Sequence, residues 1–287
     1  MGEEPLRVTF YGVRGSTPCS GPHLERYGGN TSCVVLEHRD EEPIVLDLGT
    51  GLRPYGCRII GQGRGGYRST MLLTHLHWDH VQGLPFFAPI HCPDSELDIY
   101  GPPEDLETFG DLVAKLMCPP FFPIEPGDLI GRVRFHCLSD DDVVVGDAKI
   151  RARPVPHTGR TNGYRVDWGG ASVAYVPDHQ EPIGRPRHVD DRVLELCDEV
   201  DLLIHDAQFT PRELEQRPDW GHCTVEYAVE VARQCRARRL ALFHHDPMHD
   251  DDTVDGLTDG ARAGAGDLPS LDVFAAAEGM TIGLGAV

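Results

Sequence analysis

The chain has 287 residues, of which 46 are acidic and 26 are basic, and its formal net charge at pH 7 is −20. This length suits one large domain, and no shift in composition marks an internal boundary, so we expect a single domain over residues 1–287. Affinity for nucleic acid depends on neutralising many phosphates with lysine and arginine, so a nucleic-acid partner is not expected. The expected partner is a small-molecule substrate, with a homodimer as a further option.

The sequence gives no sign of a membrane or secreted protein. No segment has the length and hydropathy of a membrane span, and the amino terminus lacks the apolar core of a signal peptide. The 9 cysteines form no CxxC pair and are expected to be free thiols. We therefore predict a cytoplasmic protein.

Short runs rich in apolar and β-branched residues recur along the chain and predict strands. They lie near residues 7–11, 32–37, 44–47, 69–73, 97–100, 131–137, 149–154, 162–168, 171–176, 201–205, 239–243 and 280–284. Helical patterns separate groups of these runs, the clearest over residues 104–117 and 224–236, with shorter ones near Gly51, Val81, Asp190 and Pro211. Periodicity alone permits several folds that combine helices with sheets.

The most informative segment follows the apolar run at residues 71–73. It places potential metal ligands at His75, His77, Asp79 and His80. His75 and His77 are two apart and can point the same way from an extended chain, so they could share one ion. Asp79 and His80 follow where the chain must turn and would face a second ion. Imidazole and carboxylate together suit zinc, with manganese or iron as alternatives.

This segment resembles the signature of the metallo-β-lactamase superfamily. The resemblance implies an α+β fold, the αββα sandwich, in which two mixed β-sheets flanked by helices hold two divalent metal ions. It also implies three further ligands that follow later strands. His157 comes after the run at 149–154, and Asp178, which would bridge the two ions, comes after the run at 171–176.

The last ligand is ambiguous by inspection, because the run at 240–243 leads into the adjacent His244 and His245. The segment at 221–232 resembles the histidine-led helix start of ribonuclease Z-like members of the superfamily. The register that this resemblance implies favours His244 as the ligand. His245 is then the reserve ligand, and His245 and His249 are expected at the mouth of the site or behind its ligands.

His222 stands just before the predicted helix at 224–236, for which Thr224 is a candidate N-cap. The resemblance to ribonuclease Z and to cyclic phosphodiesterases implies that His222 protonates a leaving group or stabilises a phosphoryl oxygen, and that Asp206 orients it. The alternative is an ordinary histidine at a helix start. Asp79 is a catalytic candidate as well as a ligand.

The assembled site has His75, His77 and His157 on one ion, Asp79, His80 and His244 on the other, and Asp178 between them. Two divalent ions so placed can provide a bridging hydroxide for hydrolysis. We expect a dinuclear metal-dependent hydrolase of a small or cyclic phosphodiester. One alternative is a carbon-ester, lactone or thioester hydrolase in a biosynthetic pathway. An alternative of another class is a non-catalytic protein that binds through its metals.

Other segments are expected near the site. Arg14, Ser16 and Asn30 belong to loops that could contact a phosphate or be solvated, and Asp47 is expected to orient a histidine ligand. Residues 84–128 are rich in proline and phenylalanine. They are expected either to shape the substrate entrance or to cap the core beneath a long loop.

Overall fold

The computed structural model describes residues 4–63, 66–185, 187–266 and 271–285. One set of strands comprises β1 (Leu6–Gly12), β2 (Cys33–Glu37), β3 (Ile44–Leu46), β4 (Arg68–Leu72), β5 (Glu96–Gly101), β6 (Arg132–Cys137) and β14 (Thr281–Leu284). The other set comprises β7 (Asp141–Val145), β8 (Ala148–Pro154), β9 (Asn162–Trp168), β10 (Ala171–Val176), β11 (Leu202–Asp206), β12 (Arg239–Phe243) and β13 (Asp272–Ala275).

The helices are α1 (Leu52–Gly61), α2 (Trp78–Val81), α3 (Phe109–Leu116), α4 (Asp191–Cys197), α5 (Pro211–Gln216), α6 (Val225–Gln234) and α7 (Asp251–Gly264). Short 3-10 turns occur at η1 (Pro22–Leu24), η2 (Leu84–Phe86), η3 (Ala88–His91) and η4 (Pro126–Asp128).

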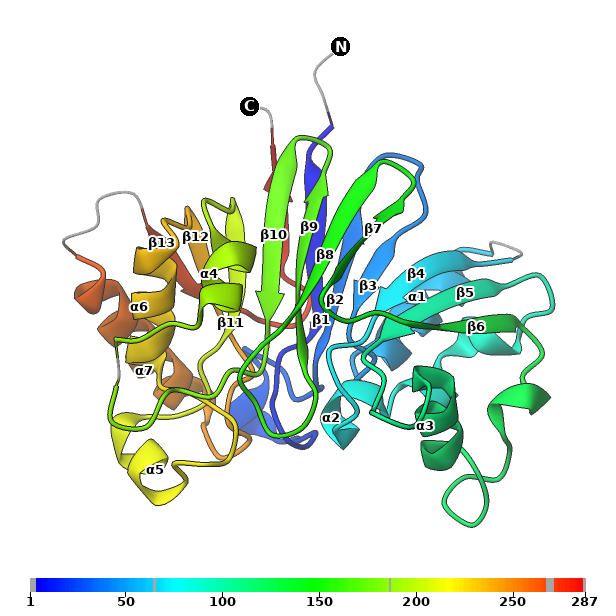
Figure 1. Cartoon of the computed structure of the whole chain (residues 1–287), viewed down its shortest axis with the longest axis horizontal. Coiled ribbons are helices and arrows are strands. Elements are labelled where there is room, and N and C mark those ends of the chain that lie inside the picture. Colours follow the sequence, from blue (N-terminus) through cyan, green and yellow to red (C-terminus); the bar gives the residue numbers. More distant parts are fainter. Residues whose placement is uncertain (1–3, 64–65, 186, 267–270, 286–287) are drawn as a thin grey trace.

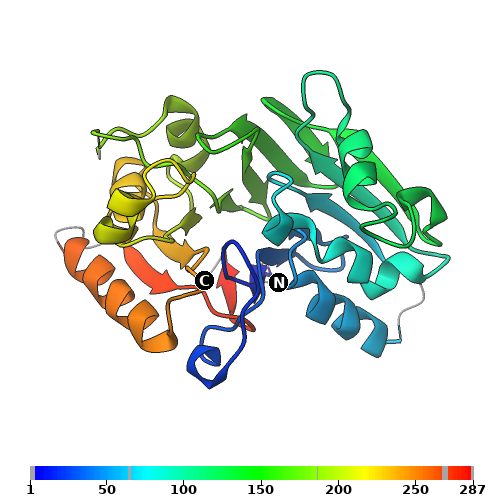
Figure 2. The same cartoon turned by 90° about the horizontal axis from the view of Figure 1, so that it is seen from below.

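The strands form two seven-stranded sheets, with the orders β14-β1-β2-β3-β4-β5-β6 and β13-β12-β11-β10-β9-β8-β7. Helices α1 and α3 lie on one outer side and α4, α6 and α7 on the other, as Figure 1 shows. Seen from below in Figure 2, the two helical layers stand apart with the sheets between them. The predicted α+β sandwich of two mixed sheets flanked by helices is confirmed.

Three apolar clusters hold these layers together. Phe10, Tyr164 and Phe243 belong to the cluster between the two sheets, in which residues of both sheets are buried. A second cluster joins α4, α6 and α7 to their sheet, and a third joins α1 and α3 to theirs. Because β10 is buried along its whole length, it carries an unbroken run of apolar and small residues rather than an alternating pattern.

Strand direction determines where the candidate site residues gather. Strand β4 is parallel to β3 and β5, and β10, β11 and β12 are parallel to one another. Strand β8 is antiparallel to β9, which is antiparallel to β10, so β8 runs in the same direction as β10. The carboxyl ends of β8, β10, β11 and β12 therefore open at one edge of their sheet, and the 3.0 Å contact of His80 with Asp178 brings the segment after β4 to the same edge. Loops at such an edge often carry functional residues.

The structure differs from the predicted elements at a few points. The predicted helix at 104–117 begins only at Phe109, because Thr108 and Asp111 form a reciprocal capping box there. Strands β7 and β13 and helix α7 were not predicted. Helix α7 escapes a propensity-based prediction because Gly256, Gly260 and Gly264 interrupt it.

No helix in the described ranges is long and apolar enough to cross a membrane. Residues 1–3, at the amino terminus that was considered for a signal peptide, fall outside those ranges. The expectations of a single domain and of a cytoplasmic location stay predictions.

The glycines of α7 give a test of how this helix is stabilised. A Cβ built at Gly256 or Gly260 meets no heavy atom within 4 Å. Gly256→Ala and Gly260→Ala should each stabilise the fold by about 0.5–1 kcal/mol, because alanine loses less backbone entropy in a helix. The double variant should unfold at higher urea concentration with an unchanged slope. Gly56→Ala in α1 is the matched control and should destabilise, because its Cβ would lie 2.8 Å from the Phe87 ring.

Candidate metal centre

Every predicted ligand lies at the edge of the sandwich where the parallel strands end. His75, His77, Asp79 and His80 follow β4 or begin α2, and His157 follows β8. Asp178 and His244 follow β10 and β12 within two residues of the strand ends. Segments far apart in the chain thus bring histidines and carboxylates into one place.

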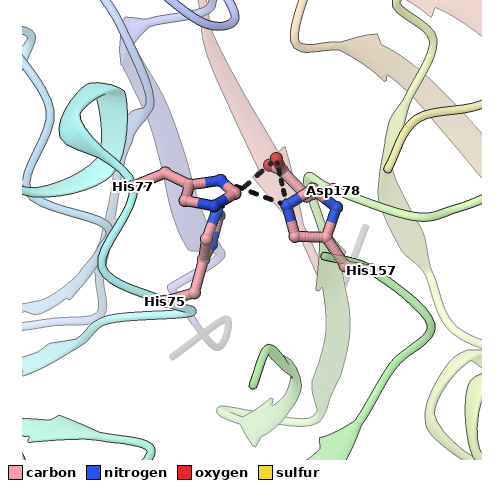
Figure 3. Close-up of side chains that lie close together, drawn as sticks. All are labelled: His75, His77, His157 and Asp178. Carbon is pink, nitrogen blue, oxygen red and sulfur yellow. Dashed lines mark hydrogen bonds and ion pairs between the residues drawn. The ribbon is translucent and has the colours of Figure 1, made fainter. Parts of the chain in front are cut away.

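One cluster comprises His75, His77, His157 and Asp178, each of which offers one ligand atom within 4.8 Å of the others. Nε2 of His157 lies 3.2 Å from Nδ1 of His77 and 3.5 Å from Oδ2 of Asp178. Nε2 of His75 lies 3.7 Å from the same Asp178 oxygen. Figure 3 shows these side chains pointing toward one another from different segments. This is the spacing expected of groups that surround one metal ion.

A second cluster comprises Asp79, His80 and His244, all of them buried. Nε2 of His244 lies 3.0 Å from Oδ2 of Asp79 and 3.3 Å from Nε2 of His80. His244 adopts a left-handed backbone conformation with a φ of 59°, which is uncommon for a residue with a side chain. The backbone after β12 is therefore held in a strained form at the residue that joins this cluster.

Asp178 lies between the two clusters. Its Oδ1 is 3.0 Å from Nε2 of His80 and 3.4 Å from Nε2 of His244, whereas Oδ2 faces His75 and His157. One carboxylate thus presents one oxygen to each cluster. This placement supports the bridging role expected of Asp178, which stays a proposal.

The buried polar atoms of the clusters fit divalent metal ions. Nε2 of His75 is buried and forms no hydrogen bond within the described part of the chain, and buried Oδ1 of Asp178 has only the contacts with His80 and His244 described above. Burial lowers the pKa of His75 and His157, so these imidazoles are neutral, which is the form that binds metal. Burial alone would lower the pKa of His80, but the carboxylates around it, led by Asp178, raise it well above its usual value. The surroundings of His80 therefore favour a positive charge, which a divalent ion would supply.

Partners outside the clusters hold the other ring nitrogen of several histidines. Such contacts fix the ring orientation and tautomer of a metal ligand. The Nδ1 contacts are His157 with the Gly221 carbonyl at 2.6 Å, His244 with the Gln208 amide oxygen at 2.8 Å, His80 with an Asp47 carboxylate oxygen at 2.7 Å, and His75 with the Thr74 hydroxyl at 3.0 Å. The structure thus places Asp47 behind His80, one of the candidate ligands.

His222 lies beside both clusters at the start of α6. Its Nδ1 is 2.9 Å from Oδ2 of Asp206, which places Asp206 as expected for an orienting carboxylate. The ring of His222 is stacked on that of His244, with centroids 5.0 Å apart. Burial alone would lower the pKa of His222, but Asp206 raises it above the usual value. His222 can also be grouped with Asp178 and His244 as a potential metal-binding set.

Several other expectations are corrected or completed by the structure. His245 is absent from the metal-binding groups of the described residues, and its Nε2 faces the Ala276 carbonyl at 3.0 Å. His249 also lies outside these groups, and its Nε2 is 2.9 Å from Oε1 of Glu213. Arg14 does not reach a phosphate site, because it is fully buried and donates to backbone carbonyls such as that of His249 at 2.7 Å.

The loop at Ser16 and the segment at 84–128 have roles that the structure makes specific. The backbone N–H of Ser16 donates to Oδ2 of Asp79 at 2.7 Å, so this loop positions a site carboxylate. Residues 84–128 divide between the two roles that were considered. Phe87 and Phe109 are buried in the core, whereas Phe86 and Phe121 line a cavity.

Gln208 and Gly221 are the site residues that sequence reasoning missed. Gln208 lies two residues after Asp206 at the end of β11, and that position after a strand was the available signal. Gly221 offered no signal as an isolated glycine, because its importance depends on the ring of His157 packing against its backbone.

Comparisons with known proteins give the family to which this geometry is related. A sequence model of the β-lactamase superfamily domain matches residues 69–245. Ribonuclease Z of Natronomonas pharaonis is 28% identical over 92% of this chain and 95% of its own length. Ribonuclease Z of Haloferax volcanii is 27% identical over 83% of this chain and 84% of its own length. The predicted resemblance to ribonuclease Z-like proteins is confirmed.

Solved structures agree with the fold. The metallo-β-lactamase fold protein YhfI from Bacillus subtilis covers 98% of this chain and 100% of its own, with a TM-score of 0.71 and 19% identity. The short form of human tRNase Z covers 98% of this chain and 100% of its own, with a TM-score of 0.67 and 21% identity. At these identities, the likeness shows the shared fold.

The prediction of a small-molecule partner in place of nucleic acid is wrong, because the matching relatives are named ribonuclease Z. The prediction rested on the formal net charge of −20, which sums over the whole chain. Many acidic side chains are paired at the surface, for example Asp252 with Arg26 at 2.5 Å and Asp201 with Arg238 at 2.8 Å. A phosphate responds mainly to the charge near it, so the total is a poor guide to a local site.

The contact between Gly221 and His157 yields a test of the first cluster. Gly221 has a φ of 94°, and a Cβ there would lie 2.4 Å from Nδ1 of His157. Gly221→Ala should displace this ring and weaken metal binding by about 10- to 100-fold, measured by competition with a chelator. Gly184→Ala is the matched control, because Gly184 has a φ of 71° but a Cβ there meets nothing within 4 Å. Equal metal affinity in the two variants would contradict the placement of His157.

Proposed function

The chain belongs to the β-lactamase superfamily, and from this membership we propose that it is a dinuclear metal-dependent phosphodiesterase that hydrolyses RNA. The observation that carries the proposal is the contact of His222 with Asp206 at the edge of two adjoining clusters of metal-binding side chains. The relatives named ribonuclease Z support a phosphodiester in RNA as the bond that is cut.

The proposed ligands follow the two clusters. His75, His77 and His157 would hold one ion, Asp79, His80 and His244 the other, and Asp178 both. The mixture of imidazole and carboxylate favours zinc. Two bound divalent ions would lower the pKa of a water molecule and offset the negative charge of the phosphoryl oxygens.

His222 is the proposed general acid. Because Asp206 occupies its Nδ1, the other ring nitrogen, Nε2, is left to carry a proton toward the substrate. In the hydrolysis, a water molecule gives up one proton to the solvent as its oxygen forms a bond to phosphorus, and the bond from phosphorus to the leaving oxygen breaks. The proton on Nε2 passes to that leaving oxygen, which departs as an alcohol.

Asp79 is proposed to orient the attacking water as well as to bind metal. Its Oδ2 accepts the Ser16 N–H at 2.7 Å and lies 3.0 Å from Nε2 of His244. No hydrogen bond between described residues involves its Oδ1, so this oxygen is free to accept one from a water. The contact with Ser16 restrains the orientation of the carboxylate.

Metal content tests the ligand assignment. The purified protein should hold close to two divalent ions per chain by elemental analysis. His77→Ala and Asp178→Ala should each lose most of the metal and the activity, with the far-ultraviolet circular dichroism retained. His188→Ala, which changes an exposed histidine outside the clusters, is the control and should keep both. Full metal occupancy in the two site variants would show that the ligands are assigned wrongly.

The leaving group tests the role of His222. His222→Ala should keep its metals but lose about 10²- to 10⁴-fold in kcat on RNA, whose alkoxide leaving group needs a proton. The loss should be much smaller on bis-p-nitrophenyl phosphate, because p-nitrophenolate departs without protonation. Both rates would be measured at saturating substrate on metal-analysed protein.

Other outcomes have distinct meanings. A small and equal effect on both substrates would return His222 to an ordinary position at a helix start, and loss of metal would place it among the ligands. Turnover of carbon esters, lactones or thioesters, with none of RNA or bis-p-nitrophenyl phosphate, would refute the phosphodiesterase proposal.

A further inference from the structure

A cavity of about 430 Å³ lies between α1, the segment around α3 and α2, the helix that begins within the metal-binding segment. Its walls include Trp78, Phe86, Phe121 and Phe122. In Figure 1, α2 and α3 lie in the lower part of the molecule, with α2 near the middle and α3 below β5 and β6. The volume falls within the range of about 300–1,000 Å³ that is usual for small-ligand sites.

The aromatic walls are unusually exposed. Trp78 is 58% exposed, Phe86 61% and Phe121 78%. The rings of Phe86 and Phe122 meet edge to face at 87° with centroids 5.9 Å apart, so their faces are not stacked against each other. Large aromatic faces gathered around one cavity are typical of a site that receives a planar ring.

Polar groups at the cavity add hydrogen-bonding capacity to these apolar walls. Arg53 and Gln82 line it, and neither side chain makes a hydrogen bond or ion pair with another described residue. Asn30 also lines it and donates its side-chain N–H to Glu278 at 2.8 Å, which leaves its amide oxygen available. The combination suits a flat ring with donors and acceptors on its edge, linked to a negatively charged group.

The cavity adjoins the metal-binding segment in the sequence. Trp78 stands between His77 and Asp79, which belong to the two metal-binding clusters. All of the lining residues lie between Asn30 and Phe122, whereas His222 approaches from the other half of the sandwich. A group bound in the cavity would therefore lie on the α2 side of the centre, away from the proposed general acid.

We propose that this cavity binds the nucleobase of the nucleotide that keeps the phosphate after cleavage. The inference rests on the proposed phosphodiesterase function and adds a specificity site to it. His222 protonates the leaving oxygen, so the leaving nucleotide lies on its side, and the nucleotide that retains the phosphate extends toward Trp78. Stacking on Phe86 and Phe121 would hold its base, with Arg53 and Gln82 at the edge of the ring.

Two chromogenic diesters isolate the effect of the base. Uridine 5′-(p-nitrophenyl phosphate) and methyl p-nitrophenyl phosphate share a leaving group and differ in the group that keeps the phosphate. The wild-type protein should prefer the nucleoside ester in kcat/KM. Phe121→Ala should reduce this preference by about 10- to 100-fold, because base–aromatic stacking is lost. Phe86→Ala should act in the same direction.

The control variant is Leu106→Ala, which removes a side chain that is 96% exposed and does not line the cavity. It should leave the preference unchanged. An unchanged preference in Phe121→Ala and Phe86→Ala would overturn the inference, as would a wild-type protein that shows no preference. Weaker self-association of Phe121→Ala in sedimentation, with its substrate preference intact, would instead assign the aromatic surface to a contact between two copies of the chain.

Direct binding separates this inference from the proposed function. If the metal-loaded wild-type protein hydrolyses neither diester, the phosphodiesterase proposal fails, and the cavity is tested by calorimetric titration with uridine 5′-monophosphate. Binding that Phe121→Ala weakens by about 10-fold or more, and Leu106→Ala does not, would sustain the nucleobase site. Absence of binding, or equal binding in all three proteins, would overturn it.

Discussion

The buried carboxylate of Asp47 is the interaction on which the metal centre depends. It accepts the Thr74 N–H at 2.7 Å and the Tyr175 hydroxyl at 2.9 Å, and it holds Nδ1 of His80 at 2.7 Å. Thr74 and His80 belong to the segment after β4, whereas Tyr175 belongs to β10 of the opposite sheet. A fully buried carboxylate is costly unless donors surround it. The two sheets must therefore pack so that donors from both reach the Asp47 carboxylate. The same packing brings Asp178, three residues beyond Tyr175, toward the histidines.

Regular and irregular segments contribute different groups to the site. The ends of parallel strands supply side chains whose metal-binding atoms converge, and less regular segments supply the groups behind them. Gln208 and the Gly221 carbonyl, for example, hold histidines by their outer nitrogens. Orientation matters because an imidazole binds metal only along the lone pair of one nitrogen. The left-handed backbone at Asp47 and at His244, with φ values of 58° and 59°, occurs at this centre, where the surrounding contacts can offset its cost.

Sequence reasoning reached most strands because apolar runs leave local signals. It reached the candidate ligands because histidines and aspartates follow those runs in the order that a family resemblance implies. Apolar runs mark β4, β10 and β12, and the polar residues directly after them are candidates for the site. His157 and Asp178 were assigned their roles by that resemblance. His244 and His245 could not be separated by local pattern alone and required the register implied by a resemblance. Helix α7 was missed because Gly256, Gly260 and Gly264 lower its propensity, while packing against β13 and α6 holds it in place. The cavity beside Trp78 was only partly foreseen, since its walls come from segments that tertiary structure alone brings together.

The acidic composition is compatible with an anionic substrate once charge is considered locally. Asp79 and Asp178 are the carboxylates within the proposed ligand set, and the charge of two divalent ions would exceed theirs. The centre would then be positive at the point where a phosphate binds, although the chain as a whole is strongly negative. Screening at physiological salt limits the reach of distant surface charges to about 8 Å, so the acidic surface opposes binding much less than its total suggests. A substrate held mainly by metals at its phosphate and by stacking at its base would need few basic side chains, which reconciles this composition with the proposed cleavage of RNA.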